Sequence, residues 1–377
     1  MRRAAAPLAL DPLLAGLALA LVLIGLVAIA SASVGYADAR FGNPWHHAQR
    51  HAGYCLASLL TALVVYRLPT RFWYDSAGLW LLLSLALLAL VLVPGVGKSV
   101  NGSQRWLPLG PLTVQPSELV KGTSVLFLAG YLVRQQSAVR SQWQGFLRPM
   151  LVLGVIALLL LFEPDFGATV IVLGTAFGML FLAGMKLLHL FIVIGLSLFG
   201  LLALILSAPY RLQRLTAYTD PWADPFGAGF QLIQSLIAFG RGEWFGVGLG
   251  NSVQKLFYLP EAHTDFVFSI WAEETGFLGA AALLGLLLAL ILRIGVIGRA
   301  AARAGDGFGA YLCFGVALIF AGQAFINTGA SSGLLPTKGL TLPLVSYGGT
   351  ALLTSCCLLA MVLRVERDLR PAARSAR

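Results

Sequence analysis

The chain has 377 residues, of which 58% are hydrophobic and only 11% are charged, and its mean hydropathy is +0.83. This composition excludes an ordinary soluble globular protein and indicates an all-α polytopic membrane protein. The formal net charge of +10 does not indicate a nucleic-acid partner, because the basic residues lie in loops between apolar runs, where they act as a topology signal.

A bilayer-spanning helix needs about 20 apolar residues, at roughly 1.5 Å per residue. The first apolar run follows Met1-Arg2-Arg3 and is too long for a signal-peptide core, so we count it as a span. We predict ten spanning helices, at Pro12–Ser33, Ala52–Val65, Ser76–Val93, Ser117–Val133, Phe146–Phe162, Phe166–Ala183, Leu187–Leu206, Phe266–Leu292, Tyr311–Thr328 and Leu342–Leu363.

An even number of spans places both termini on one side of the membrane. That side carries 16 of the 26 Lys and Arg residues, so we predict that both termini are cytoplasmic. The external side carries the unusual sequence, at Pro94–Pro116, Glu163-Pro164-Asp165, Ser207–Thr264 and Gly329–Pro343. Long external loops with their own structure suggest that the protein works on that side.

The chain is predicted to be a single membrane domain (1–377) with one large periplasmic loop (207–264). Inside that loop, Phe230–Phe239 places Ile233, Leu236 and Ile237 on one face and Gln231, Gln234 and Ser235 on another. This pattern predicts a short amphipathic helix, lying in the membrane interface or covering the helix ends as a lid. The Ala- and Arg-rich cytoplasmic tail (369–377) is expected to be disordered.

Asp265 is the first candidate for chemistry, because it lies just before the apolar run Phe277–Leu292. Counted back from Arg293, the membrane core begins near Glu273, and Asp265 lies roughly 12 Å further out, at headgroup level. A partly desolvated carboxylate there could act as a general base. The alternative is a helix N-cap or first-turn acid, which the helix dipole favours. His263 could orient Asp265 or simply face solvent.

Glu118 and Lys121 follow Pro116, which suits the first turn of a helix. A lysine about 8 Å inside a span needs a partner or a wet cavity, and Glu118 is three residues away on the same face. An internal ion pair and a cation facing a phosphate are both compatible with this spacing.

Further cations lie in Gly- or Pro-bearing external loops, namely Arg105 and Lys338. Together with Lys121 and Lys255 they would form a basic outer cavity that suits the pyrophosphate of an anionic lipid headgroup. Ser346 opens the Ser-Tyr-Gly-Gly-Thr segment at the start of the last span, where the glycines allow close approach of a helix or a ligand.

Other patterns carry little weight. Gly246-x-Gly248-x-Gly250 resembles a nucleotide loop, but no strand precedes it. The histidines show no metal spacing, and the four cysteines indicate neither a disulfide framework nor a zinc site. We therefore expect no metal site and no required cofactor, although a divalent cation would be compatible with a pyrophosphate substrate.

Three blocks of the chain resemble the SEDS family (shape, elongation, division, sporulation), whose members polymerise peptidoglycan glycan strands from lipid II. They are Asn101–Lys121, Gly246–Gly276 and Gly333–Gly349. The resemblance covers nearly the whole chain. The Pro-Thr-Lys-Gly-Leu-Thr-Leu form of the last block is similar to the cell-division members rather than to the elongation members.

The resemblance implies ten spanning helices, cytoplasmic termini and a large periplasmic loop between the seventh and eighth helices. It also implies that Asp265 is the essential acid and that Arg105, Glu118, Lys121 and Lys338 belong to the substrate site. Our substrate-site predictions from the residues add Lys255, His263 and Ser346.

The activity implied is a peptidoglycan glycosyltransferase of septal cell-wall synthesis in the bacterial inner membrane, which joins lipid II units by β-1,4 bonds and releases undecaprenyl pyrophosphate. The implied partners are lipid II, the nascent glycan strand, membrane lipids, a class B penicillin-binding protein (an FtsI-type transpeptidase) and the division proteins FtsQ, FtsL and FtsB. Two alternatives are a lipid II flippase and a non-catalytic division scaffold. A flippase predicts a continuous polar path, whereas the cytoplasmic halves of the spans are almost purely apolar.

Overall fold

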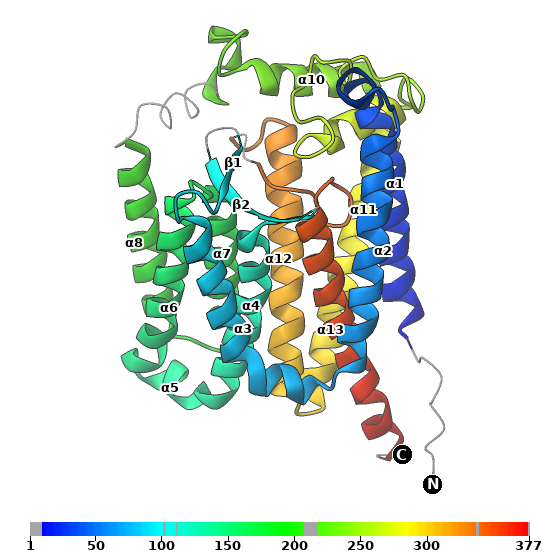
Figure 1. Cartoon of the computed structure of the whole chain (residues 1–377). Helices are drawn as coiled ribbons and strands as arrows, with labels where there is room; N and C mark the ends of the chain where they lie inside the picture. Colours follow the sequence, from blue (N-terminus) through cyan, green and yellow to red (C-terminus); the bar gives the residue numbers. More distant parts are fainter. Residues whose placement is uncertain (1–9, 101–102, 111, 207–217, 337–338, 376–377) are drawn as a thin grey trace.

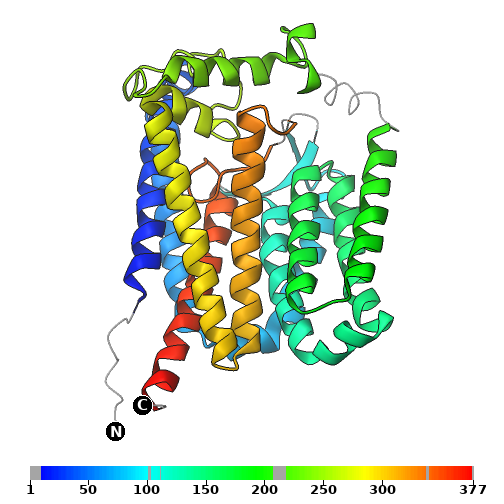
Figure 2. The same cartoon turned by 180° about the vertical axis from the view of Figure 1, so that it is seen from behind.

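The computed structural model describes residues 10–100, 103–110, 112–206, 218–336 and 339–375. Its helices stand side by side in one bundle (Figure 1, Figure 2). A long helix lies over each predicted span: α1 (Pro12–Phe41), α2 (His46–Arg67), α3 (Thr70–Val91), α4 (Pro116–Arg134), α6 (Trp143–Phe162), α7 (Phe166–Leu182), α8 (Leu187–Leu206), α11 (Val267–Arg303), α12 (Gly307–Ser331) and α13 (Gly349–Ser375).

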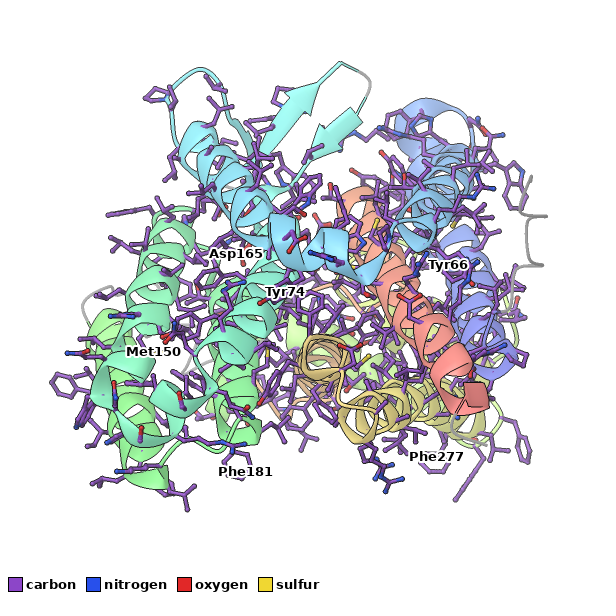
Figure 3. All side chains as sticks on the ribbon, turned by 90° about the horizontal axis from the view of Figure 1, so that it is seen from below. Tyr66, Tyr74, Met150, Asp165, Phe181 and Phe277 are labelled. Atoms are coloured by element: carbon purple, nitrogen blue, oxygen red, sulfur yellow. The ribbon has the colours of Figure 1, made fainter. Side chains whose placement is uncertain are left out.

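The outside of the bundle is apolar. Leu82, Leu151 and Leu196 are each more than 60% exposed, which suits a surface that faces lipid rather than water. Within the described residues, six helices are long and apolar enough to cross a membrane, and α7 and part of α8 are shorter apolar helices. A multi-pass membrane protein is therefore confirmed, while the count of ten crossings stays a prediction. The view along the bundle (Figure 3) places Met150 of α6 and Phe277 of α11 on opposite sides.

Local sequence explains the helix ends. The carboxylate of Asp11 accepts a hydrogen bond from the backbone N–H of Leu14 at 2.7 Å and caps α1, which begins at Pro12. Pro116 likewise opens α4. The beginning of α1 and the end of α13 lie at the same end of the bundle (Figure 1), as an even number of spans requires.

The prediction for the last span was wrong at both ends. Leu342–Gly348 is a buried coil, and α13 begins only at Gly349. The coil is apolar because it is enclosed in the bundle: a methyl group on Gly25 of α1 would lie 2.8 Å from the backbone of Val345. The tail expected to be disordered from residue 369 is helical as far as Ser375, since Arg370 pairs with Glu366 one turn earlier at 2.8 Å.

Helix α11 covers the predicted span Phe266–Leu292, but it is divided at Gly276, which has φ 69° and ψ −169°. The segment Glu243–Gly248, which we call the strap, lies in the break. The N–H of Phe277 donates to the carbonyl of Glu243 at 2.8 Å, and the N–H of Val247 donates to that of Glu273 at 3.0 Å. The strap thus supplies the backbone hydrogen bonds that the helix loses at Gly276.

The end of the bundle opposite the termini carries a small sheet and the helix α10 (Figure 1). Strands β1 (Lys98–Val100), β2 (Ser103–Leu109) and β3 (Leu112–Val114) form an antiparallel sheet in that order, with Lys98 opposite Trp106 and Leu107 opposite Val114. A short helix α5 (Gln136–Ser141) lies at the other end, and a 3-10 turn η1 (Pro221–Ala223) precedes α10 (Phe230–Gly242).

Helix α10 confirms the predicted short helix and crosses the helix ends as a lid (Figure 1). Its polar face was predicted wrongly, because Ser235 is completely buried whereas Ile237 is 36% exposed. The Ser235 hydroxyl lies 2.6 Å from that of Ser269 in α11 and donates to the carbonyl of Ser331 in α12 at 2.6 Å. These partners account for a buried serine on this helix.

Candidate active site at the outer end of the bundle

Asp265 lies in the last turn before α11 and is partly buried. The N-cap of α11 is Phe266, and no side chain caps the helix there, so the N-cap interpretation of Asp265 was wrong. Burial and, to a smaller extent, the charge of Glu261 raise the pKa of Asp265 to about 7, with Arg105 opposing the shift. A carboxylate with a pKa near neutrality suits a general base.

Arg105 projects from β2 to the turn between α6 and α7. Its Nε donates to the carbonyl of Glu163 at 3.0 Å, and its Nη2 donates to that of Pro164 at 2.5 Å. Because both acceptors are backbone carbonyls, the guanidinium is held in place without being neutralised by them. It is half-buried, and its charge acts on both Asp265 and Glu163.

The sequence analysis gave no role to the acids of this turn. Glu163 is completely buried, and neither of its carboxylate oxygens has a hydrogen-bond partner among the described residues. Burial and the neighbouring Asp165 raise the pKa of Glu163 to about 8, with Arg105 opposing them, so this carboxyl is largely protonated at neutral pH. Asp165 caps α7 by accepting from the N–H of Ala168 at 3.1 Å. The signal for this turn in the sequence was the presence of two acidic residues within three positions between two apolar runs.

Glu118 and Lys121 form the predicted buried ion pair. Lys121 Nζ lies 2.8 Å from the Glu118 carboxylate, and the two side chains are 2% and 8% exposed. The start of α4 is joined to the start of α13, because the N–H of Gln115 donates to the Thr350 hydroxyl at 3.2 Å. The pair lies in the outer part of the bundle, but its positive charge is compensated.

Lys255 does not contribute a free cation to a basic cavity, contrary to our expectation. It is 6% exposed, and its Nζ lies 2.8 Å from Glu274 of α11 and 2.9 Å from the hydroxyl of Ser31 of α1. The pair Lys255–Glu274 therefore fastens the large loop to two helices. Glu273 adds a second attachment, since it accepts hydrogen bonds from Ser252 Oγ and the Val253 N–H.

His263 and Ser346 belong to the joint between the Asp265 segment and the coil before α13. The His263 ring packs against the rings of Tyr36, His47 and Tyr347 at centroid distances of 5.7, 4.8 and 5.5 Å. Burial lowers the pKa of His263, with Glu261 opposing the shift, so the ring is neutral at pH 7. The Ser346 hydroxyl accepts from the N–H of Leu342 at 2.9 Å and thus supports the coil itself.

Asn327 of α12 was missed by the sequence analysis. It is 1% exposed, and its Nδ2 donates to the backbone carbonyls of Asp265 at 2.8 Å and of Leu340 at 2.6 Å. A methyl group on Gly339 would lie 3.0 Å from the Oδ2 atom of Asp265. The Gly333–Gly349 block therefore reaches the acid. Lys338, the predicted cation of that block, lies outside the described residues.

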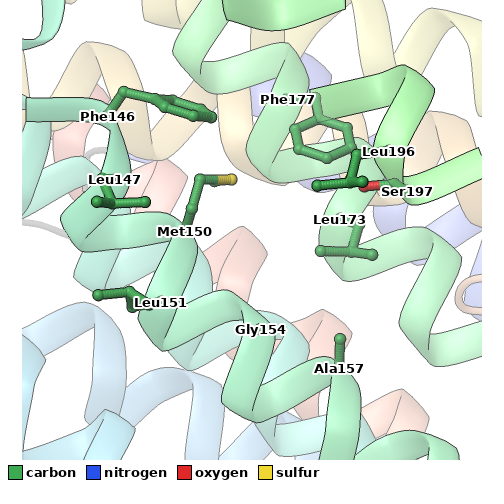
Figure 4. Close-up of a pocket in the computed structure, with 10 residues that line it drawn as sticks. All are labelled: Phe146, Leu147, Met150, Leu151, Gly154, Ala157, Leu173, Phe177, Leu196 and Ser197. Carbon is green, nitrogen blue, oxygen red and sulfur yellow. The ribbon is translucent and has the colours of Figure 1, made fainter. Parts of the chain in front are cut away.

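The histidine, cysteine and acidic side chains of the described part of the chain form no group of three that could hold a metal ion, so we derive no step through a divalent cation. A cavity of about 370 Å³ lies between α6, α7 and α8 (Figure 4). Its lining includes Phe146, Met150, Leu173, Phe177 and Leu196, with Ser197 as the polar member, so it offers no acid or cation for chemistry.

Known proteins resemble this chain over almost its full length. A family model described as a cell cycle protein of the FtsW, RodA and SpoVE type matches residues 11–371. The protein named probable peptidoglycan glycosyltransferase FtsW from Nitrosococcus halophilus is 52% identical over 360 residues, which are 96% of this chain and 93% of that protein. The one of that name from Coxiella burnetii is 49% identical over 350 residues, covering 93% and 94%.

Two solved structures share the fold. A chain from a study of polymerisation and crosslinking by a peptidoglycan synthase complex has a TM-score of 0.76 and 34% identity, covering 96% of this chain and 98% of that one. The rod-shape-determining protein RodA of Thermus thermophilus has a TM-score of 0.70 and 31% identity, covering 96% and 97%. These similarities show that the chain belongs to the FtsW/RodA/SpoVE (SEDS) family.

Proposed function

We propose that this chain is a peptidoglycan glycosyltransferase that polymerises lipid II on the outer side of the bacterial inner membrane. The observation that carries the proposal is the arrangement around Asp265: a partly buried carboxylate with a pKa near 7, the guanidinium of Arg105, and the Gly339 backbone of the lysine-bearing loop. This arrangement lies beside apolar helices, where a polyprenyl tail could stay in the bilayer while its headgroup reacts.

In the proposed step, the Asp265 carboxylate accepts the proton of the 4-hydroxyl of the acceptor sugar. The hydroxyl oxygen attacks the anomeric carbon of the donor strand, and the bond from that carbon to the pyrophosphate oxygen breaks. Undecaprenyl pyrophosphate leaves with the electron pair, and inversion at carbon gives the β-1,4 bond. Arg105 stabilises the negative charge that develops on the leaving group, because its charge is not compensated by its carbonyl partners. Lys338 is proposed to complete the binding of the pyrophosphate, whereas the charge of Lys121 is already compensated by Glu118.

The biological setting proposed is septal cell-wall synthesis, with both termini in the cytoplasm. A class B penicillin-binding protein is the proposed partner, since the similar chain of known structure comes from work on a peptidoglycan synthase complex that couples polymerisation to crosslinking. FtsQ, FtsL and FtsB are proposed as further partners within the division machinery.

The test is polymerisation of lipid II by the purified protein together with its partner transpeptidase, comparing the native chain with Asp265→Asn. Asparagine keeps the shape of the side chain but cannot accept the proton, so we expect strand formation to be lost while the complex still assembles. Normal polymerisation by Asp265→Asn would place the base elsewhere. If neither protein polymerises lipid II, transport of labelled lipid II across vesicles would favour the flippase, and intact cell division with Asp265→Ala would favour the scaffold.

A further inference from the structure

Two irregular segments of the chain meet at one buried side chain. The Asp265 segment approaches from the large loop, and the Gly339–Gly348 coil approaches from the loop before α13. Neither segment has the continuous backbone ladder that fixes a helix or a strand. Both present a backbone carbonyl to the Nδ2 atom of Asn327, from Asp265 at 2.8 Å and from Leu340 at 2.6 Å.

The chemistry of this contact fixes the side chain in one orientation. An amide nitrogen carries two N–H groups, and here both are used. If the amide were turned over, its oxygen would face two carbonyl oxygens, so the donor must be the nitrogen. Asn327 is 1% exposed, which removes competition from water for these two bonds.

The position of the contact connects it to the reacting carboxylate. Leu340 follows Gly339, whose backbone lies against the Oδ2 atom of Asp265. Holding the carbonyls of Asp265 and Leu340 on one nitrogen therefore sets the distance between the carboxylate and the Gly339–Gly348 coil. A base displaced by about 1 Å loses roughly 100-fold in rate.

We propose that Asn327 is a positioning residue, which holds the Asp265 segment and the lysine-bearing loop at the spacing that the transfer reaction requires. The kinetic consequence of this inference rests on the proposed function, whereas the geometry around Asn327 is independent of it. Lipid II binding should depend on Asn327 much less than turnover does, because the contacts of Asn327 are with the protein backbone.

Two substitutions separate positioning from general stability. Asn327→Ser keeps one donor and a small polar side chain. Asn327→Asp keeps the shape but sets a carboxylate oxygen against two carbonyls. The matched control is Thr328→Val on the same helix, because the Thr328 hydroxyl bonds only to the carbonyl of Ala324 one turn earlier, at 2.8 Å, among the contacts described.

The first readout is hydrogen exchange of the backbone amides in residues 261–266 and 339–346, which needs no substrate. We expect Asn327→Ser to exchange about tenfold faster there, as the loss of a hydrogen bond of about 1.4 kcal/mol requires, while Thr328→Val stays within about twofold of the native protein. Equal exchange in the native protein and Asn327→Ser, or an equal rise in Thr328→Val, would overturn the proposal. Asn327→Asp is the stronger perturbation. If Asn327→Asp does not fold, the exchange rates of Asn327→Ser decide whether the proposal holds.

The second readout is lipid II polymerisation. We expect kcat to fall about 10- to 100-fold in Asn327→Ser with KM within about threefold, and the acid limb of the pH profile to move to lower pH as water reaches Asp265. A fall in activity that only matches the loss of folded protein, with an unmoved pH profile, would indicate a merely structural role. If the native protein does not polymerise lipid II, the proposed function fails, and the exchange measurement still decides the role of Asn327.

Discussion

Two substitutions on either side of Asp265 should move the acid limb of activity in opposite directions. Arg105 lowers the pKa of Asp265 and Glu261 raises it, against the larger effect of burial. Arg105→Gln removes the positive charge and should raise the pKa, so that activity is lost at a higher pH. Glu261→Gln removes a negative charge, keeps a hydrogen-bond acceptor for Thr264, and should shift the limb to lower pH.

The size of the effect follows from the value near 7. A base with this pKa is half protonated at pH 7, so the rate should fall about tenfold for each pH unit below it. An ordinary aspartate, with a pKa of 3.8, would keep full activity down to about pH 5. Both substituted groups are at least partly exposed, and one charge there is worth on the order of 0.5 to 1 kcal/mol, or roughly 0.3 to 0.7 pH units.

The assay is the initial rate of lipid II polymerisation between pH 5.5 and 9 in one detergent, with size-exclusion profiles at each pH to confirm that the protein stays folded. Arg105→Gln should also lower the plateau, because Arg105 holds the turn at Glu163 and Pro164. The midpoint of the acid limb is independent of that loss. Shifts of the same sign in both variants, or full activity of the native protein down to pH 5.5, would refute the assignment of Asp265 as the base.

Three further predictions concern stability and are read from melting temperatures in detergent. The pKa of Glu163 is about 8, above the 4.5 of an ordinary glutamate, so the folded state keeps a proton that the unfolded state releases, and stability falls as pH rises from about 4.5 to 8. Glu163→Gln should therefore stabilise the protein by about 1–3 kcal/mol at pH 8 and change its stability little at pH 4. An equal effect at both pH values would contradict this reasoning. Lys255→Met should cost about 3–5 kcal/mol by leaving Glu274 buried and unpaired, and the double variant Lys255→Met/Glu274→Met should recover most of it; no recovery would show that the pair is not the cause. Gly242→Ala should destabilise by about 3 kcal/mol or more, because the added methyl would lie 2.2 Å from a backbone oxygen of α11, whereas Gly240→Ala in the same helix meets open space and should be neutral or slightly stabilising.

The sequence predicted those parts of the fold that follow from local rules. Apolar runs long enough to cross a bilayer predicted the positions of the long helices, because the thickness of the bilayer sets the number of apolar residues that a spanning helix needs. The Glu118–Lys121 pair was predicted correctly, since residues three apart on a helix must lie on one face. The short helix α10 was predicted from its periodicity, although its buried face was not.

The remaining features depend on contacts between distant parts of the chain. The division of α11 at Gly276 was not predicted, because the strap that supplies the missing hydrogen bonds comes from the preceding loop. The glycine pattern at Gly246 was discounted as a nucleotide loop because no strand precedes it. In the structure a methyl on Gly246 would lie 2.2 Å from the carbonyl oxygen of Glu274, so this glycine permits two backbones to touch.

The candidate site was also predicted only in part from the sequence. Asp265 and Arg105 could be singled out by residue type and loop position. The burial that raises the pKa of Asp265 could not be predicted in this way. Asn327 lies 62 residues from Asp265, and a single asparagine in an apolar helix does not disclose its partner. Lys255 was misjudged because its partner Glu274 is 19 residues away, across the loop that the pair holds in place.

The difference between Arg105 and the two buried lysines favours Arg105 as the group that would bind the pyrophosphate in the proposed reaction. Lys121 and Lys255 each lie 2.8 Å from a carboxylate, so a phosphate that approached them would have to displace an existing negative charge. Arg105 is fixed by carbonyl oxygens, which orient its planar donors without removing its charge. Its remaining N–H groups can therefore bind an incoming anion without displacing a negative charge. The acids around it, with Asp265 and Glu163 shifted toward their protonated forms, reduce the repulsion that the same anion would otherwise meet. A site with one oriented arginine, a Glu163 carboxyl that holds its proton near neutral pH, and an Asp265 carboxyl that is ionised in about half of the molecules at pH 7 is suited to bind a pyrophosphate, and the ionised Asp265 can accept a proton from a sugar hydroxyl.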